Sequence, residues 1–150
     1  MSTDSGPGPE VSQRLGYLLK HAEMRLEELS AKALAPFGVD QRELGILLLL
    51  ASHEPASQQQ VAQRLGVDRT TMVARLDTLE GKGLVSRHPH AEDRRRNVVE
   101  LTAAGQETLR RAIQASNEAE RVLLTPLSPR DSQHLREALQ RIVAQDRNEP

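Results

Sequence analysis

The sequence predicts a mainly α-helical fold that carries one small β-hairpin. Its apolar residues are mostly Leu, Ala and Val, with one Tyr, one Phe and no Trp in 150 residues. Over most of the chain they recur every three or four positions, which is the spacing of amphipathic helices. One stretch near the middle is instead β-prone on both sides of a polar loop, as is typical of a hairpin. We therefore expect helices that bury leucine and alanine stripes around a modest core.

A single domain is expected to follow a short leader. Residues 1–10 are rich in Ser, Gly and Pro without a periodic apolar pattern, so we predict a disordered leader there. The domain then occupies residues 11–147, a common domain length. No apolar run approaches the ~20 residues of a membrane span, and the start MSTDSGPGPE lacks the basic and apolar parts of a secretory signal. These features predict a soluble, cytoplasmic protein without membrane contact.

Two helices are predicted in the first third of the chain. Residues 11–34 place Leu or Ala every three or four positions, which predicts a long amphipathic helix ended by Pro36. Asp40 followed by Glu43 has the spacing of a capping box, in which each side chain accepts a hydrogen bond from the other residue's backbone N–H. The apolar run that follows, LGILLLLA, predicts a buried second helix.

The next two helices are short and are predicted to form a helix-turn-helix. Ser57 and Gln60 repeat the capping-box spacing, and Gly66 ends the helix that they begin. Asp68 can cap a second helix that runs to about Glu80. The motif needs a small residue where its helices cross, a turn residue that tolerates positive φ, and an apolar residue that packs the second helix. In that order, these roles fit Ala62, Gly66 and Met72.

A hairpin and two long helices complete the predicted fold. Residues 84–88 and 98–101 are β-prone and flank a charged loop, which predicts a hairpin of the length of a wing. Thr102 is placed to cap a long helix, and Ser128 followed by Pro129 opens a last one. The expected order is a winged helix-turn-helix over residues 40–102 between dimerisation helices at 11–35 and 103–147.

Basic charge is concentrated in one part of the chain. The formal net charge is −1, which is low for a protein that binds phosphates. Between Lys82 and Val98, however, five basic residues stand against two acidic ones. Arg94, Arg95 and Arg96 crowd at the tip of the hairpin, where their repulsion is costly unless an anion or a carboxylate lies near. This distribution favours a local DNA-contacting surface.

The predicted winged helix-turn-helix would read double-stranded DNA with two elements. The second helix of the motif lies in the major groove, and Arg on a slender hairpin suits the narrow minor groove. On an isolated helix, arginines are more often a solvated face, but the basic hairpin that follows weighs against that alternative. Which residues contact bases and which contact phosphates is left open. The predicted DNA-binding residues are Ser57, Gln58, Asp68, Arg69, Thr70, Thr71, Arg75, Arg87, Asp93, Arg94, Arg95 and Arg96.

The order of these motifs resembles the MarR (multiple antibiotic resistance regulator) family. The resemblance is carried by LxxLExKGLVxR at 76–87, DRR at 93–95 and VxLTxxG at 99–105. It implies a regulator of transcription, usually a repressor, that acts as a homodimer with interlocked terminal helices. It also implies that Arg95 is the minor-groove finger and that Asp93 orients it.

A homodimer is also predicted from the helices alone, because the three long ones carry more apolar surface than a small winged domain can cover. Two-fold symmetry places the recognition helices one DNA turn apart, ~34 Å, so the expected operator is an inverted repeat. The resemblance further implies a small aromatic or phenolic effector. Tyr17, Lys20, His21 and Met24 could line its cleft, and the alternative is that this Tyr and His pack at the dimer interface.

Other functional classes find less support. The absence of Cys excludes disulfides and thiolate chemistry. His88 and His90, with Glu92 and Asp93, have metal-site spacing, but the Pro between the histidines and the solvated loop favour a plain wing, so we expect no metal and no cofactor. No catalytic motif occurs, so no enzyme is expected. The remaining alternative is a winged-helix scaffold or protein-interaction module without specific DNA readout, against which the arginine cluster argues, because protein interfaces are depleted of such charge.

Overall fold

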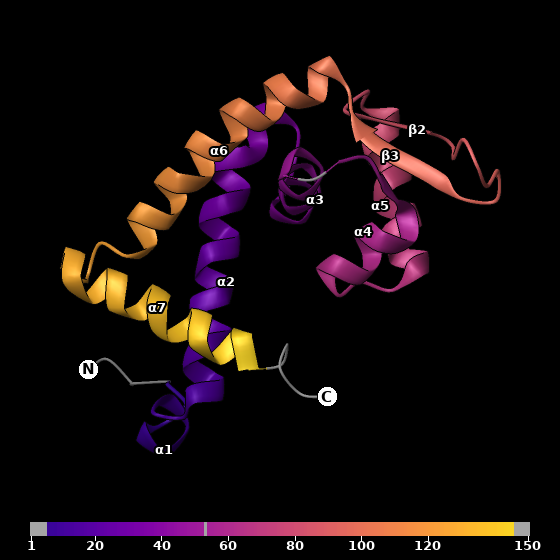
Figure 1. Ribbon diagram of the computed structural model, residues 1–150. Coiled ribbons are helices and arrows are strands. Elements are labelled where there is room, and N and C mark those ends of the chain that lie inside the picture. Colours follow the sequence, from indigo (N-terminus) through magenta and orange to yellow (C-terminus); the bar gives the residue numbers. More distant parts are fainter. Residues whose placement is uncertain (1–5, 53, 146–150) are drawn as a thin grey trace.

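The computed structural model describes residues 6–52 and 54–145 and is mostly helical, with one small sheet (Figure 1). The elements are α1 (Pro9–Ser12), α2 (Leu15–Leu34), a 3₁₀ turn (Ala35–Phe37), α3 (Gln41–Ser52), β1 (Ala56–Ser57), α4 (Gln58–Leu65), α5 (Arg69–Gly81), β2 (Val85–Pro89), β3 (Asn97–Leu101), α6 (Ala103–Leu123) and α7 (Pro129–Gln145). The elements from α3 to β3 form a winged helix-turn-helix, and the long helices α2, α6 and α7 extend from it. The predicted fold class is confirmed.

Two features of the chain differ from the expectation. The predicted leader reached residue 10, but Pro9 and Glu10 already belong to α1, because Pro at the first helical position fixes a helical φ. The long first helix is also interrupted, since Gln13 and Arg14 separate α1 from α2. Residues 1–5 of the leader and residues 146 and 147 of the expected domain lie outside the described residues.

The sheet has three strands instead of the two that the hairpin predicted. Strand β3 pairs antiparallel with β2 over its whole length and with β1 on its other side, in the order β1-β3-β2. In the short added pairing, Ala56 lies opposite Val99 and Ser57 opposite Val98. Two residues are too few to show an alternating pattern, so sequence reasoning missed β1. Strand β1 fixes the start of α4 against β3.

The helix caps lie where the sequence placed them. Asp40 and Glu43 form a reciprocal capping box at 2.8 and 3.2 Å. Ser57 and Gln60 form a second one at the start of α4, at 3.2 and 3.0 Å. Gly66 adopts a φ of 64° in the turn between α4 and α5, a conformation that L side chains avoid. Each cap supplies partners for backbone groups that a helix end leaves unpaired.

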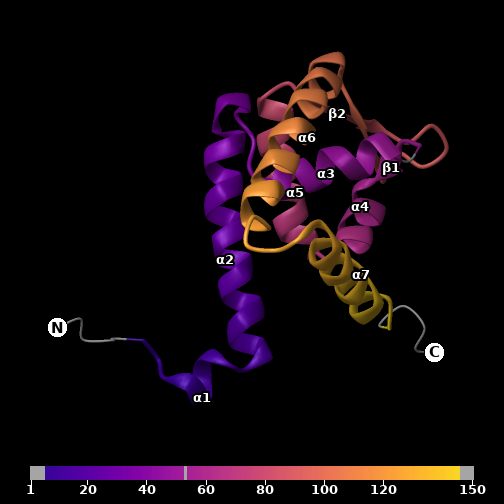
Figure 2. The ribbon, with the colours of Figure 1, turned by 90° about the vertical axis from the view of Figure 1, so that its left-hand side faces the viewer.

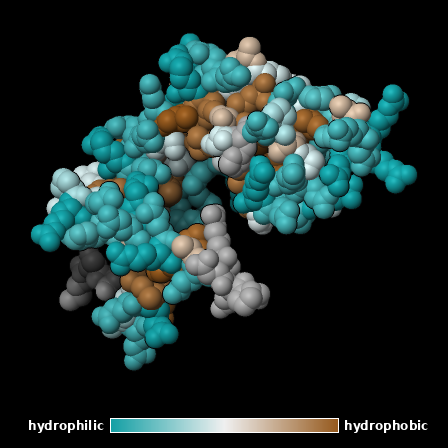
Figure 3. All heavy atoms as spheres, viewed as in Figure 1, coloured by the Kyte–Doolittle hydropathy of each residue, from teal (hydrophilic) through white to brown (hydrophobic). Residues whose placement is uncertain are grey.

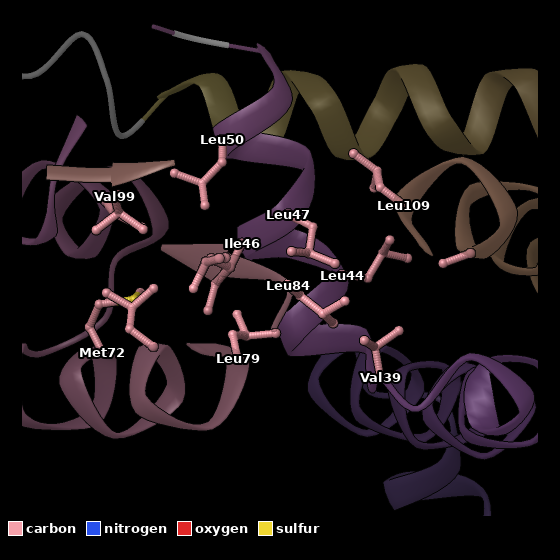
Figure 4. Close-up of a cluster of buried hydrophobic side chains, with 14 of the residues drawn as sticks. Val39, Leu44, Ile46, Leu47, Leu50, Met72, Leu79, Leu84, Val99 and Leu109 are labelled. Carbon is pink, nitrogen blue, oxygen red and sulfur yellow. The ribbon is translucent and has the colours of Figure 1, made fainter. Parts of the chain in front are cut away.

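One continuous core holds the winged helix-turn-helix together. Helix α3 lies at its centre, and Figure 4 shows side chains of α5, β3 and α6 pointing toward it. Burying each large side chain stabilises the fold by about 1.5–3 kcal/mol. The largest fully buried residues are Leu34, Ile46, Leu47, Val61, Met72, Leu76, Leu79, Val85 and Val99.

The start of α6 is fixed to the turn that ends α5. The hydroxyl of Thr102 donates to the carbonyl of Gly83 at 2.6 Å, and its N–H donates to the carbonyl of Leu84 at 3.1 Å. Gly105 packs directly over that second carbonyl, and a Cβ at this position would overlap the oxygen atom. The long helix α6 and the helix-turn-helix are therefore held in one orientation.

Helices α2 and α6 pack side by side, whereas α7 is largely uncovered. No residue of α7 is buried, and Figure 2 shows this helix apart from α2, which it crosses in the view of Figure 1. An apolar groove of about 510 Å³ lies between α2, α6 and α7. Figure 3 shows hydrophobic residues at the surface on this side of the molecule, while the end of the wing is hydrophilic. The exposed large apolar residues of these helices and their flanks are Val11, Leu15, Leu18, Leu19, Met24, Val122, Leu127, Leu135, Leu139, Ile142 and Val143.

Gly105→Ala is expected to destabilise the protein by about 3 kcal/mol, because the added methyl group must displace the Leu84 carbonyl and the helix that packs on it. Urea unfolding followed by circular dichroism measures the loss. Gly45→Ala is the matched control, since a Cβ there meets no atom within 4 Å and should raise stability by about 0.5–1 kcal/mol. Equal stability of Gly105→Ala and the wild type would refute the close packing.

Candidate nucleic-acid interface

Helix α5 carries a buried face, and its remaining surface is polar. Met72 is fully buried, as the helix-turn-helix pattern predicts, and Leu76 and Leu79 are buried beside it. Of the predicted readers, Arg69 and Thr70 are exposed, whereas Thr71 and Arg75 are half-buried. The two arginines point to different flanks, because six residues turn a helix by about 600°, or 240° beyond one full turn. Arg69 lines a cleft between α5 and the wing, and Arg75 does not.

The first residues of α4 and α5 are occupied by caps. The hydroxyl of Ser57 accepts from the N–H of Gln60. Asp68 accepts from the N–H of Thr71 at 2.9 Å and from its hydroxyl at 2.7 Å, and these two hydrogen bonds lower the pKa of Asp68. An ionised carboxylate repels phosphate, so the structure gives Asp68 the role of a helix cap. As direct DNA contacts, Ser57, Asp68 and Thr71 remain predictions.

Asp93 organises the tip of the wing. Its carboxylate accepts from the backbone N–H of Arg95 at 3.0 Å, and its carbonyl accepts from the N–H of Arg96 at 3.0 Å. The other carboxylate oxygen lies 3.7 Å from Nε of Arg96. The N–H of His90 donates to the Arg96 carbonyl at 2.8 Å, which closes the loop. Asp93 thus orients the backbone at Arg95, while its charge faces Arg96, and the side chains of Arg94 and Arg95 have no ion pair among the described residues.

Arg87 has partners within the protein. Its guanidinium donates to Asp77, to both oxygens of Glu80 at 3.2 Å, and to the side-chain oxygen of Gln58 at 2.9 Å. Only 16% of its side chain is exposed. The hydrogen bonds to Glu80 raise the pKa of Arg87 and lower that of Glu80. Arg87 and Gln58 therefore join β2, α4 and α5, and their role as DNA contacts remains a prediction without support from this arrangement.

A cleft separates the start of α5 from the wing, and it brings together residues distant in the sequence. Arg69 from α5 lines it with Arg95 and Arg96 from the wing. Gln59 at the start of α4 and Asn97 at the start of β3 also line it and were not predicted as site residues. No sequence signal identifies them, because both are single polar residues. Asn97 directly follows Arg96, but Gln59 and Arg69 come near it only in the folded chain.

The four residues predicted to bind a ligand lie on the first half of α2. The rings of Tyr17 and His21 stack with their centroids 4.0 Å apart. Lys20 and Met24 are exposed, and none of the four lines the groove between α2, α6 and α7. Within one chain, these four residues therefore share the surface of one helix, and they lie outside the groove between α2, α6 and α7.

The wing histidines face separate partners. His88 Nδ1 lies 3.5 Å from a carboxylate oxygen of Glu100. His90 Nδ1 accepts from the backbone N–H of Glu92 at 3.1 Å. Within residues 6–52 and 54–145, no three His, Cys, Asp or Glu side chains gather in a way that could hold a metal ion.

Arg87→Ala is expected to lower the free energy of unfolding by roughly 1–2 kcal/mol, because three acceptors on two helices lose their shared donor. Glu80 has a lowered pKa, so its contribution is complete above the ordinary value of 4.5 and is lost as the pH falls through the lowered value. The difference in the free energy of unfolding between the wild type and Arg87→Ala should therefore become smaller in acid. Urea unfolding at several pH values measures both effects.

Arg110→Ala is the control for that experiment. Arg110 pairs with Glu107 on the exposed surface of α6, three residues away along one helix. Exposed pairs of this kind contribute little, so this variant should unfold close to the wild type at neutral pH. An Arg87→Ala variant as stable as Arg110→Ala would show that Arg87 does not join the three elements.

Comparison with known proteins assigns the chain to a family. The sequence profile of the MarR family matches residues 37–96. The HTH-type transcriptional regulator PecS of Dickeya dadantii (strain 3937) is 29% identical over 127 residues, which are 83% of this chain and 76% of that protein. The solved structure of the transcriptional repressor CouR bound to a 23-mer DNA duplex is 34% identical, with a TM-score of 0.82, and the match covers 91% of this chain and 96% of that one.

A second solved structure, CouR from Rhodococcus jostii RHA1 bound to p-coumaroyl-CoA, is 27% identical, with a TM-score of 0.76 over 90% of this chain and 95% of that one. Among residues 6–52 and 54–145, the structure has no helix that is long and apolar enough to cross a membrane. PecS is named as a regulator of transcription and CouR as a transcriptional repressor. The profile match and the full-length likeness to CouR show that this chain belongs to the MarR family of transcriptional regulators, as its motif order predicted.

Proposed function

We propose that this protein is a cytoplasmic repressor that binds an inverted-repeat operator as a homodimer and has no catalytic role. The observation that carries the proposal is the group of exposed arginines at the end of the wing, where Arg94 and Arg95 have no ion pair among the described residues. Guanidinium groups without carboxylate partners bind phosphate and the electronegative minor groove. The DNA duplex held by CouR supports DNA as the partner.

The two reading elements have separate tasks. Helix α5 is held by its buried leucines with Arg69 and Thr70 exposed at its start, which suits insertion into the major groove. The wing carries Arg95 to the adjacent minor groove, and Asp93 holds the backbone at that position. The alternative, a winged helix that serves only as a protein-interaction module, is not favoured, because the relatives are named as transcriptional regulators.

A second copy of this chain is the proposed cover for the apolar face of the terminal helices. Helix α7 exposes Leu135, Leu139, Ile142 and Val143 and has no buried residue. Exposed apolar surface that runs over several helices marks an interaction site. Pairing these helices about a two-fold axis covers it and holds two α5 helices at a fixed separation.

The proposed signal is a small aromatic or phenolic ligand that binds where two chains meet near Tyr17 and His21. The stacked rings, with Lys20 on the same helix, offer an aromatic surface beside a cation. The p-coumaroyl-CoA held by CouR, which carries a phenolic group, supports this class of ligand. Such a ligand would release DNA by changing the separation of the two readers.

Arg95→Ala should weaken binding to the operator by about 1–3 kcal/mol while the variant still elutes as a dimer. Fluorescence anisotropy with duplexes from the gene's own upstream region measures the affinity, and light scattering measures the mass. Binding that any bulk DNA competes away, with no preference for an inverted repeat, would contradict the repressor function. An unchanged affinity would instead remove Arg95 alone from the interface.

An effector of the proposed class should raise the melting temperature of the free dimer and dissociate the operator complex. Hydroxycinnamic and other phenolic acids are the first compounds to test, by thermal shift and by anisotropy. Tyr17→Leu keeps the helix and removes the stacked ring, so it should lower the response to the ligand without lowering DNA affinity. If these acids leave both the melting temperature and the complex unchanged, the proposed signal is wrong.

A further inference from the structure

The cleft between α5 and the wing has the composition of an anion site. Arg69 from one side and Arg95 and Arg96 from the other line a volume of about 370 Å³. Its other polar lining comes from Ser57, Gln58, Gln59 and Asn97, and its apolar lining from Met72 and Val73. The lining thus contains three guanidinium groups and no carboxylate.

Of the polar groups around this cleft, Arg69, Arg96, Gln59 and Asn97 are available to a ligand, whereas Ser57 caps α4 and Gln58 accepts a hydrogen bond from Arg87. Arg69 forms no ion pair among the described residues, and Arg96 approaches Asp93 only at 3.7 Å. The side chains of Gln59 and Asn97 are exposed and form no side-chain hydrogen bond within residues 6–52 and 54–145. Arg87 differs from these arginines. It lies on β2 opposite Val99, and its guanidinium is neutralised by Asp77 and Glu80.

The position of the cleft identifies the anion. If α5 occupies the major groove and the wing occupies the adjacent minor groove, the DNA strand that separates the grooves must pass between them. The cleft lies at that place, between the start of α5 and the wing residues Arg95, Arg96 and Asn97. A backbone phosphate of that strand is the anion that the docking brings there.

We propose that this cleft is a phosphate cradle, in which Arg69, Arg96, Gln59 and Asn97 hold one backbone phosphate of the strand between the two grooves. The inference rests on the proposed DNA-binding function and adds Gln59 and Asn97 to the interface. It assigns Arg69 to the backbone, so that base reading falls to the other side chains of α5. Because phosphates are the same in every sequence, this contact fixes register without selecting a sequence.

Salt dependence tests the cradle on DNA of any sequence. Arg69→Ala should weaken binding to an arbitrary duplex and to the operator by the same factor, and should reduce the slope of log K against log salt concentration by about 0.9. Gln59→Ala should weaken both by about 2- to 10-fold with an unchanged slope, because it removes a neutral donor. Arg130→Ala, an exposed arginine at the start of α7, is the control for the loss of one positive charge.

The double variant tests whether the residues share one phosphate. Groups that bind the same phosphate are coupled, so Gln59→Ala with Arg69→Ala should lose less affinity than the product of the single losses. Full additivity would mean separate contacts and would overturn the cradle. An Arg69→Ala variant whose salt-dependence slope equals that of Arg130→Ala would also overturn the cradle. An Arg69→Ala variant with an altered sequence preference and an unchanged slope would do the same.

The arbitrary duplex separates this inference from the function on which it rests. If the wild type prefers no inverted repeat but Arg69→Ala still lowers the slope, the repressor function fails and the cradle stands. If the wild type prefers the operator and the Arg69 and Gln59 variants behave like the control, only the cradle fails. Gln59, Arg69 and Arg130 are all exposed, so thermal melting should show that the three single variants are folded.

Discussion

The contact between Gly105 and the carbonyl of Leu84 sets the relation between the two halves of the molecule. On one side of it lies the turn that ends α5, and on the other begins the long helix α6. The two hydrogen bonds from Thr102 to the same turn leave little freedom for rotation about this joint. Any change in the position of α6 therefore moves α5 with it. A ligand that moves α6, as proposed, would act on α5 through this direct backbone packing.

The arginines of α5 and the wing divide into two kinds by their partners. Arg87 is partly buried and is matched by two carboxylates and an amide, so its charge serves the architecture. Arg69 and Arg95 lie around an open cleft with no carboxylate in its lining. Identical side chains on neighbouring elements thus have different partners, because Asp77 and Glu80 face β2 and no acid lines the cleft. Net charge alone hides this division.

Much of the fold could be predicted from local sequence. The capping pairs Asp40 with Glu43 and Ser57 with Gln60, and the positive φ of Gly66, depend on residues within one turn of each other. The helix-turn-helix and the wing followed from these signals and from apolar spacing. The resemblance to a known family then identified the wing residues Asp93 and Arg95 by motif.

The rest depends on contacts between distant residues. Strand β1 forms because β3 has a free edge with which it can pair. Its two residues are too few to predict a strand from sequence. The internal partners of Arg87 come from two other elements, so its motif position suggested a DNA contact that the structure does not favour. Gln59 and Asn97 became candidates only when the fold placed them beside Arg69. The domain limits, the ligand residues and the individual DNA contacts stay predictions.

If a second copy covers the exposed face of α7, as proposed, the protein's activity depends on its abundance. When a folded surface is completed only by a second copy, mass action makes its formation depend on concentration. In the range where single chains and pairs coexist, doubling the amount of protein more than doubles the amount of the paired form. Occupancy of a two-fold site would then respond steeply to synthesis and degradation of the chain. A regulator of this kind measures its own concentration in addition to any signal that it binds.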